Sequence, residues 1–241
     1  MSGHSKFHNI KNVKGKADAA RSKIFTKISR EISVAVKAGG PDPNTNSKLF
    51  DCIQKAKANN MPNDNIQRTI KKANGEIDNV NYESVIYEGY GAGGVAFVVE
   101  CLTDNRNRTA GEVRHLFDRH GGSLGTNGSV MYMFEQKGVI VIEKKPDGMD
   151  YDQAFELAIE CGADDVKEEE EVYIFYTSLS EYKNVKDEMV KRNIEIFEAN
   201  LEYVPSNYIV PEEKNLNSLQ TLAEKLEDLD DVQNVYHNGD F

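Results

Sequence analysis

The sequence predicts an α+β protein with three domains, because its apolar periodicity changes once and its last elements follow a recognisable order. Apolar residues recur every three or four positions up to about residue 74, as in helices. After residue 81 they recur at every second position, as in strands. Residues 137–205 then follow the βαββαβ order of a ferredoxin-like domain. We expect a small N-terminal three-helix domain (1–77), a discontinuous α/β middle domain (78–136 with 206–241) and an inserted ferredoxin-like domain (137–205).

Three helices are expected in the first domain. One apolar stripe along Lys16–Ala38 predicts the first, and the turn-forming sequence GGPDPNTN ends it. The second helix covers about Ser47–Ala58. The third begins near Pro62, because proline suits the first turn of a helix, and Gly75 closes it.

The middle domain is expected to be completed by the end of the chain. Strands Tyr82–Glu88 and Val95–Thr103 flank a glycine cluster, and a helix at about Thr109–His120 and a strand at Val130–Glu135 follow. These elements leave one sheet face half covered. The tail offers only a helix near 215–229 and a strand near 232–237, which cannot bury a core by themselves. We therefore expect the tail to return to this sheet.

The inserted domain starts with a strand at Gly138. Its expected elements in order are strand Gly138–Glu143, helix Asp150–Cys161, a weak strand Asp165–Glu169, strand Val172–Thr177, helix Glu181–Arg192 and strand Glu195–Val204. The exit is marked by Pro205 and the two polar residues after it.

Charge is distributed unevenly along the chain. Residues 1–75 contain 15 Lys and Arg against 5 Asp and Glu, a net charge of +10. The remainder contains 14 against 35, a net of −21, so the overall −11 hides a basic front and an acidic back. Such asymmetry favours nucleic-acid contact by the basic part. No apolar run is long enough for a membrane span, no secretory signal is present, and three scattered cysteines are typical of a cytoplasmic protein.

The first helix is expected to carry a basic ridge. At ~100° per residue, its cations fall within an arc of roughly 80° away from the apolar stripe. They are Lys16, Lys23, Lys27, Arg30 and Lys37, and a polar arm with Lys6, Lys11 and Lys14 comes before them. An arm and a ridge of this kind fit a polyanion. The alternative is a solvated amphipathic helix whose lysines only confer solubility.

Motifs for catalysis or cofactors are not convincing. GYGAGG matches the glycine spacing of a dinucleotide site, but the next residues, VAFVVECLT, predict a strand where such a site needs a helix. A hairpin loop explains these glycines better. No metal-ligand cluster or catalytic constellation is present in the sequence. We expect no enzyme activity, no catalytic residues, no cofactor and no metal.

The segment TDNRNRTAGEVRHLFDRHGG places arginines around a helix start. Arg106, Arg108 and Arg114 could bind phosphate through their guanidinium groups, aided by the backbone amides of the first turn. Alternatively, Asp104 and Glu112 pair with these arginines and brace the loop.

Long motifs resemble the YebC/PmpR family. They are GHSKFHNIK, KIFTKISREI, GGPDPNTN, NNMPNDNIQRTIKKANG, YEGYGAGGVAFVVECLTDNRNRTAGEVRH and GGSLGTNGSVMYMF. The similarity covers nearly the whole chain, is dense up to Phe134 and is thinner in the acidic third domain. Phe7 stands where the family more often has Trp, which keeps an aromatic ring. The residues that match the family's basic amino-terminal pattern are Lys6, His8, Lys11, Lys14, Lys16, Lys23, Lys27 and Arg30.

The resemblance implies a three-domain, non-enzymatic protein that is cytoplasmic in bacteria and has relatives in mitochondria. Family members are described as DNA-binding transcriptional regulators and as ribosome-associated factors that assist translation, including at proline-rich stretches. The first helix offers lysines, which suit phosphate, and few side chains suited to reading base edges. DNA and ribosomal RNA both stay open as the partner. A protein partner for the acidic domain is compatible with either.

Overall fold

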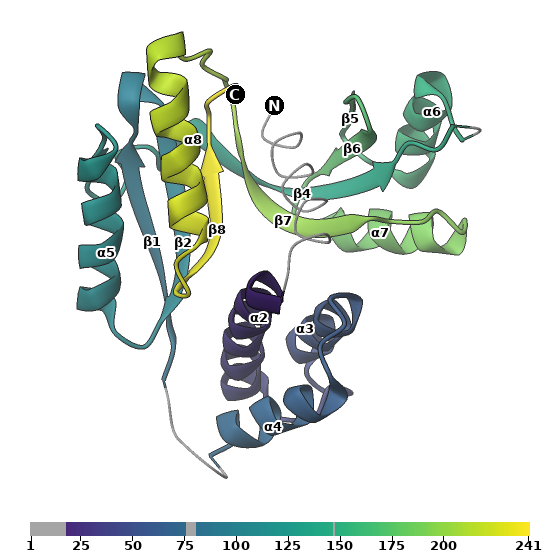
Figure 1. The fold of residues 1–241 in the computed structure, drawn as a ribbon. Coiled ribbons are helices and arrows are strands. Elements are labelled where there is room, and N and C mark those ends of the chain that lie inside the picture. Colours follow the sequence, from purple (N-terminus) through teal and green to yellow (C-terminus); the bar gives the residue numbers. More distant parts are fainter. Residues whose placement is uncertain (1–17, 76–80, 147) are drawn as a thin grey trace. The chain divides into compact units, whose positions relative to one another are not determined.

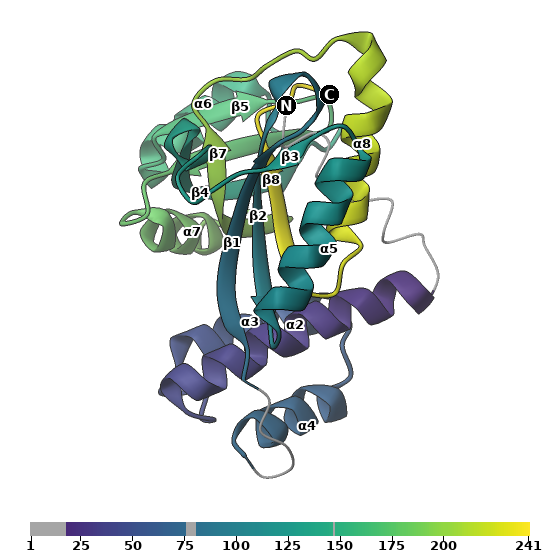
Figure 2. The same cartoon turned by 90° about the vertical axis from the view of Figure 1, so that its left-hand side faces the viewer.

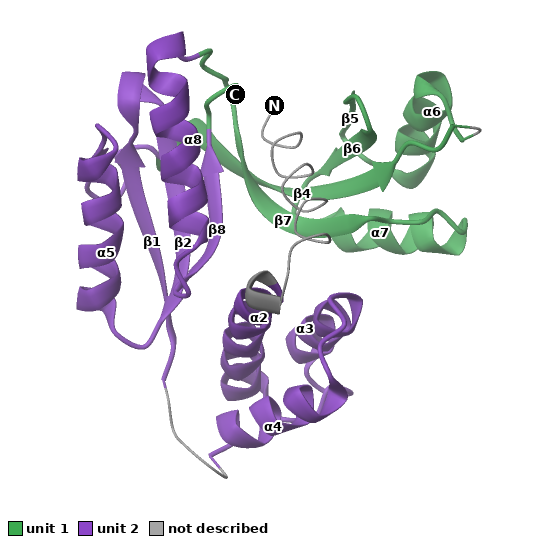
Figure 3. Cartoon of the chain, in the orientation of Figure 1, with its two compact units in different colours: residues 1–8, 131–210, 238–241 green, residues 9–130, 211–237 purple. Residues whose placement is uncertain are grey.

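The computed structural model describes residues 18–75, 81–146 and 148–241, which form a mixed α+β fold (Figure 1). The described chain is divided into two compact units (Figure 3). One unit contains residues 131–210 and 238–241, and the other contains residues up to 130 together with 211–237. Among the described helices, none is both long and apolar enough to cross a membrane. The expected boundaries of three domains stay predictions.

The helical part of the larger unit matches the sequence prediction closely. Its helices are α2 (Asp18–Gly39), α3 (Ser47–Ala58) and α4 (Asn63–Ala73). The apolar stripe of α2 packs against the inner faces of α3 and α4, and the largest fully buried side chains are Ile28, Ile32, Leu49 and Ile66. Asn46 fixes the turn between α2 and α3, because its side chain accepts from Leu49 N at 3.1 Å and donates to Ala35 O at 2.7 Å.

A four-stranded sheet with the order β3-β1-β2-β8 forms the rest of this unit. Strands β1 (Glu83–Tyr90) and β2 (Ala96–Thr103) are antiparallel and joined by a single 3-10 turn, η1 (Ala92–Gly94). Gly93 and Gly94 both have positive φ, which explains the glycines at this turn. The glycine cluster is therefore a hairpin loop followed by a strand, and the expectation of a hairpin is confirmed.

Two helices far apart in the sequence cover one face of this sheet (Figure 2). They are α5 (Arg106–Arg119) and α8 (Glu213–Glu227), and β8 (Val232–His237) pairs antiparallel with β2. Phe97 of β2 meets Phe117 of α5 edge-on, with ring centroids 5.8 Å apart. The tail thus supplies both a helix and an edge strand to the sheet.

The smaller unit has the ferredoxin-like order of elements. In chain order these are β4 (Phe134–Glu143), α6 (Tyr151–Cys161), β5 (Asp165–Glu168), β6 (Val172–Thr177), α7 (Tyr182–Lys191) and β7 (Glu198–Pro205). The sheet order is β5-β6-β4-β7 and every pair is antiparallel. One core cluster joins Ile140 and Phe175 of the sheet to Leu157 of α6 and Met189 of α7, so both helices pack on the same face.

The strand expected at Val130–Glu135 is wrong. Met131–Met133, inside the expected strand, is instead a 3-10 turn, η2. The strand that precedes this segment is the two-residue β3 (Ser123–Leu124). β4 then runs without interruption from Phe134 through Gly138, although the expected strands ended at Glu135 and began again at Gly138. Gly138, the expected first residue of the next strand, is required for packing, because a Cβ there would lie 2.2 Å from Thr177 Oγ1 and 2.5 Å from Tyr182 Cδ2.

Replacing Gly138 by alanine should therefore destabilise the protein. The added methyl group overpacks the sheet, and we expect the free energy of unfolding to fall by about 1–3 kcal/mol in urea titrations. The control is Gly111→Ala on α5, where a Cβ would meet nothing within 4 Å. That change should be neutral or stabilise by up to ~1 kcal/mol, since alanine is the better helix former. Equal stability of the two variants would contradict this role of Gly138.

Candidate nucleic-acid interface

The basic side of α2 is the first half of the candidate interface. Ile28, Ile32 and Ala35 are buried on the apolar side of the helix. Lys23, Lys27 and Arg30 follow one another at steps of four and three residues, so they share a different side. This side was predicted to be a solvent-exposed basic ridge.

In the structure, this side of α2 contacts the acidic turn, which we define as residues 227–231, from the last residue of α8 to the residue before β8. Lys23 Nζ donates to Asp228 Oδ1 at 2.8 Å, and Lys27 Nζ donates to the backbone oxygen of Glu227 at 2.8 Å. Arg30 forms an ion pair with Asp231. The open ridge is thus wrong for these three residues, because their partners lie some 200 positions away in the sequence.

The three contacts differ greatly in their exposure to solvent. The side chains of Lys23 and Asp228 are 44% and 51% exposed, whereas those of Arg30 and Asp231 are 12% and 4% exposed. Burial lowers the pKa of Lys27 from its ordinary value, and the nearby Glu227 offsets part of this. Solvent access therefore decreases along α2 from Lys23 to Arg30.

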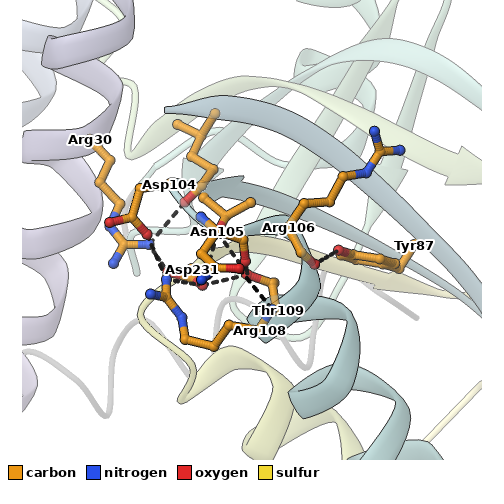
Figure 4. Close-up of polar contacts among 10 residues, drawn as sticks. Arg30, Tyr87, Asp104, Asn105, Arg106, Arg108, Thr109 and Asp231 are labelled. Carbon is orange, nitrogen blue, oxygen red and sulfur yellow. Dashed lines mark hydrogen bonds and ion pairs between the residues drawn. The ribbon is translucent and has the colours of Figure 1, made fainter. Parts of the chain in front are cut away.

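Asp231 is the centre of a polar cluster (Figure 4). Its carboxylate accepts hydrogen bonds from Arg30, from Arg108 Nη2 at 2.8 Å and from the hydroxyls of Thr103 and Thr109. Burial alone would raise the pKa of Asp231, but the hydrogen bonds from Thr109, Arg108 and Arg30 outweigh it and lower the pKa to about 2. The carboxylate thus remains ionised and ties α2 to the start of α5.

In the arginine motif at the start of α5, Arg108 binds carboxylates, whereas Arg106 and Arg114 are exposed. Arg108 Nη2 donates to Asp104 Oδ1 at 2.7 Å as well as to Asp231, so the bracing alternative holds for Arg108 and Asp104. Within the described chain, Glu112 takes no part in it. α5 begins three residues earlier than expected because Asn105 caps it, its side-chain oxygen accepting from Arg108 N at 3.1 Å.

The remaining predicted residues are placed as follows. Arg106 and Arg114 are exposed on α5, and the side chain of Arg106 points away from the Asp231 cluster (Figure 4). The carbonyl of Arg106 accepts from the Tyr87 hydroxyl at 3.1 Å. Lys37 donates to the side-chain oxygen of Asn81. Five predicted residues lie outside the described part of the chain: Lys6, His8, Lys11, Lys14 and Lys16.

Sequence reasoning missed the acidic turn and Asp231. The sequence shows a cluster of carboxylates, EDLDD, where the tail helix was expected to end. Nothing local indicates that these residues face the lysines of α2, because the pairing is tertiary. No group of three or more His, Cys, Asp or Glu among the described residues is arranged to hold a metal ion.

Comparison with known proteins assigns the chain to a family. The model of the TACO1/YebC N-terminal domain matches residues 5–76, and that of the TACO1/YebC second and third domain matches residues 82–239. The chain belongs to the TACO1/YebC family.

Relatives of this TACO1/YebC protein match it over its full length. A probable transcriptional regulatory protein of Hathewaya histolytica is 52% identical over 100% of this chain and 98% of its own length. Another with that name, from Acetivibrio thermocellus, is 54% identical over 99% and 98%. The crystal structure of a conserved hypothetical protein from Aquifex aeolicus has a TM-score of 0.85 and 45% identity, covering 94% of this chain and 93% of its own.

Replacing Asp231 by asparagine should strongly destabilise this TACO1/YebC protein at neutral pH. The amide keeps the shape but leaves the largely buried Arg30 without its carboxylate partner, whereas Arg108 keeps its pair with Asp104. Loss of one partner of a buried ion pair costs about 3–5 kcal/mol in comparable cases. The control is Asp230→Asn, at an exposed neighbouring carboxylate, which should change the free energy of unfolding by less than about 0.5 kcal/mol. Similar urea midpoints for the two variants would contradict the proposed importance of the cluster.

The contribution of the Asp231 carboxylate to stability should also appear in the pH dependence of unfolding. Because the pKa of Asp231 is lowered to about 2 in the folded protein, its ionised form stabilises the fold above its ordinary pKa of 3.8, and this contribution is lost as pH falls from about 4 to 2. We expect the free energy of unfolding to fall more steeply over that window in the wild type than in Asp231→Asn. Parallel curves for the two proteins would count against a lowered pKa.

Proposed function

We propose that this protein is a non-enzymatic, cytoplasmic regulator of gene expression that binds nucleic acid through its basic amino-terminal region. The supporting observation is the charge division, +10 up to residue 75 and −21 beyond it. The relatives' name, probable transcriptional regulatory protein, agrees with a DNA target. The proposed contacts are the arm residues Lys6, His8, Lys11, Lys14 and Lys16, the ridge residues Lys23, Lys27, Arg30 and Lys37, and Arg106, Arg108 and Arg114 of α5.

The contacts that these residues make within the chain determine how easily a phosphate could reach each of them. Arg30 and Arg108 are held by the largely buried Asp231, and a phosphate would have to break that cluster to reach them. Among the described residues, Lys23 is held only by an exposed pair, which typically contributes no more than about 1 kcal/mol. Arg106 and Arg114 are exposed. We therefore assign the first contacts to the arm and the amino-terminal end of α2, with Arg106 and Arg114 next.

The same ranking supports a second candidate function, a ribosome-associated factor that binds ribosomal RNA. Arginine is the side chain most often used to read guanine, and two of the candidate arginines are engaged by carboxylates. The remaining cations are mostly lysines, which suit phosphate. Phosphate contacts fix position without reading sequence, so we expect weak discrimination among DNA duplexes.

Competition with the acidic turn can be measured directly. Asp228→Asn removes the partner of Lys23, so binding to a DNA duplex or an RNA hairpin should become tighter. Asp230→Asn is the matched control, because it removes the same charge two residues away, at an exposed carboxylate with no ion pair in the described chain. We expect Asp228→Asn to increase affinity at least about threefold more than Asp230→Asn in fluorescence titrations at low salt. Equal effects would mean that the amino-terminal end of α2 is not a contact.

The choice between DNA and ribosomal RNA needs a separate test. A promoter reader should prefer particular duplexes over competitor DNA by at least roughly 10³-fold. A ribosomal factor should lack that preference and co-sediment with ribosomes in a salt-sensitive manner, and removal of residues 1–14 should release it. Strong duplex selectivity without co-sedimentation would decide for DNA. Co-sedimentation that survives the truncation would move the contact to Arg106 and Arg114. If the protein shows neither duplex selectivity nor co-sedimentation with ribosomes, the proposal of nucleic-acid binding is refuted.

A further inference from the structure

Helix α6 of the smaller unit presents large apolar side chains to solvent. Tyr151, Phe155 and Ile159 are 41%, 49% and 66% exposed, although they sit on a well-ordered helix. Their spacing of four residues places them in one stripe along the helix. The rings of Tyr151 and Phe155 lie 6.4 Å apart between centroids. An exposed stripe of two aromatic residues and an isoleucine is unusual on a helix that already buries another side.

This stripe is not part of the core-facing side of α6. The core side consists of Ala154, Leu157, Ala158 and Cys161, all of which are buried. At ~100° per residue, the centre of the stripe lies roughly 100° from the centre of the core side. The helix therefore has two apolar sides, and the fold uses one of them.

Both ends of α6 are capped, which fixes the helix that carries the stripe. Asp150 and Gln153 form a capping box at the start, in which Asp150 Oδ1 accepts from Gln153 N at 2.9 Å. Gly162 ends the helix in the left-handed conformation with φ of 82°. A partner would meet a backbone that is already helical, so little backbone conformational entropy is lost at this surface on binding.

Each residue of the stripe is followed in the sequence by a carboxylate. Asp152, Glu156 and Glu160 are all exposed and form a second stripe adjacent to the first. Glu160 is paired with Arg192, while α6 itself contains no lysine or arginine. Residues 137–205 contain 18 acidic and 8 basic side chains, a net charge of −10. The surroundings of the apolar stripe are therefore strongly negative.

We propose that the α6 surface, defined as Tyr151, Phe155 and Ile159 with Asp152 and Glu156, docks a basic amphipathic helix of a protein partner. Apolar side chains of the partner would cover the three exposed ones, and its lysines or arginines would face the carboxylates. Nucleic acid and anionic membrane are repelled by the same charge. A second copy of the chain would bring two acidic surfaces together. The charge thus selects a cationic protein segment.

The probe is a fluorescein-labelled Leu/Lys peptide of about 18 residues with leucines at helical spacing. It should bind the full-length protein, and a scrambled peptide of the same composition should bind at least about tenfold more weakly. Phe155→Ser with Ile159→Ser should also weaken binding at least about tenfold, with an unchanged melting temperature because both side chains are exposed. The control is Val210→Ser, which removes a more exposed apolar side chain outside α6.

Charge has its own readout. Asp152→Asn with Glu156→Gln should weaken binding of the Leu/Lys peptide and flatten its dependence on salt, whereas a Leu/Glu peptide should not bind the wild type. The proposal would be overturned if the wild type bound the scrambled peptide as tightly as the Leu/Lys peptide. It would also be overturned if Phe155→Ser with Ile159→Ser bound the Leu/Lys peptide as tightly as the wild type does. Concentration-dependent dimerisation abolished by Ile159→Ser would overturn it as well, because it would make a second copy the occupant. Binding that begins only after deletion of residues 1–16 would assign the surface to the chain's own basic arm instead.

Discussion

The ionised, nearly buried carboxylate of Asp231 is the constraint on which the larger unit depends. Removing a charge from water is costly, and the cost is offset here by two guanidinium groups and two hydroxyls. These donors come from α2, the end of β2 and the first turn of α5, while the carboxylate itself precedes β8. One side chain therefore joins the helical part of the unit to its sheet.

This constraint changes the meaning of the arginine motif before α5. In the sequence, Asp104, Asn105 and Thr109 are good capping residues around candidate phosphate-binding arginines. In the structure, Thr103 and Thr109 donate to Asp231, and Asn105 caps α5. Arg108 meets a carboxylate in the geometry that would otherwise suit a phosphate oxygen. The motif thus mainly builds the fold, and Arg106 is the arginine of the first turn whose side chain points away from the cluster.

The local part of the fold could be predicted from the sequence. Helices α3 and α4 and strands β2 and β8 follow from periodicity and turn residues, within about two residues at each end. The expected strands Val130–Glu135 and Gly138–Glu143 wrongly divided β4, which runs without interruption through Gly138. The close packing of this glycine against Thr177 and Tyr182 carries no local signal. The candidate site was harder. Lys23, Lys27 and Arg30 share one side of α2 as expected, but their acidic partners lie about 200 positions away and carry no local signal.

The gradient along α2 would allow the proposed polyanion to bind without unfolding the protein. At Lys23 the existing pair is exposed and screened by salt, so a phosphate can replace Asp228 at little net cost. At Arg30 the pair is desolvated and shared with the Asp231 cluster, so replacement would leave a buried carboxylate uncompensated. Replacement of the carboxylate by a phosphate therefore costs little at the Lys23 end of the helix and much at the Arg30 end. The exchangeable end is the one that continues in the sequence into residues 1–17, which carry four further lysines. A polyanion bound there would gain the arm and Lys23 while the cluster that holds α2 in place stays intact.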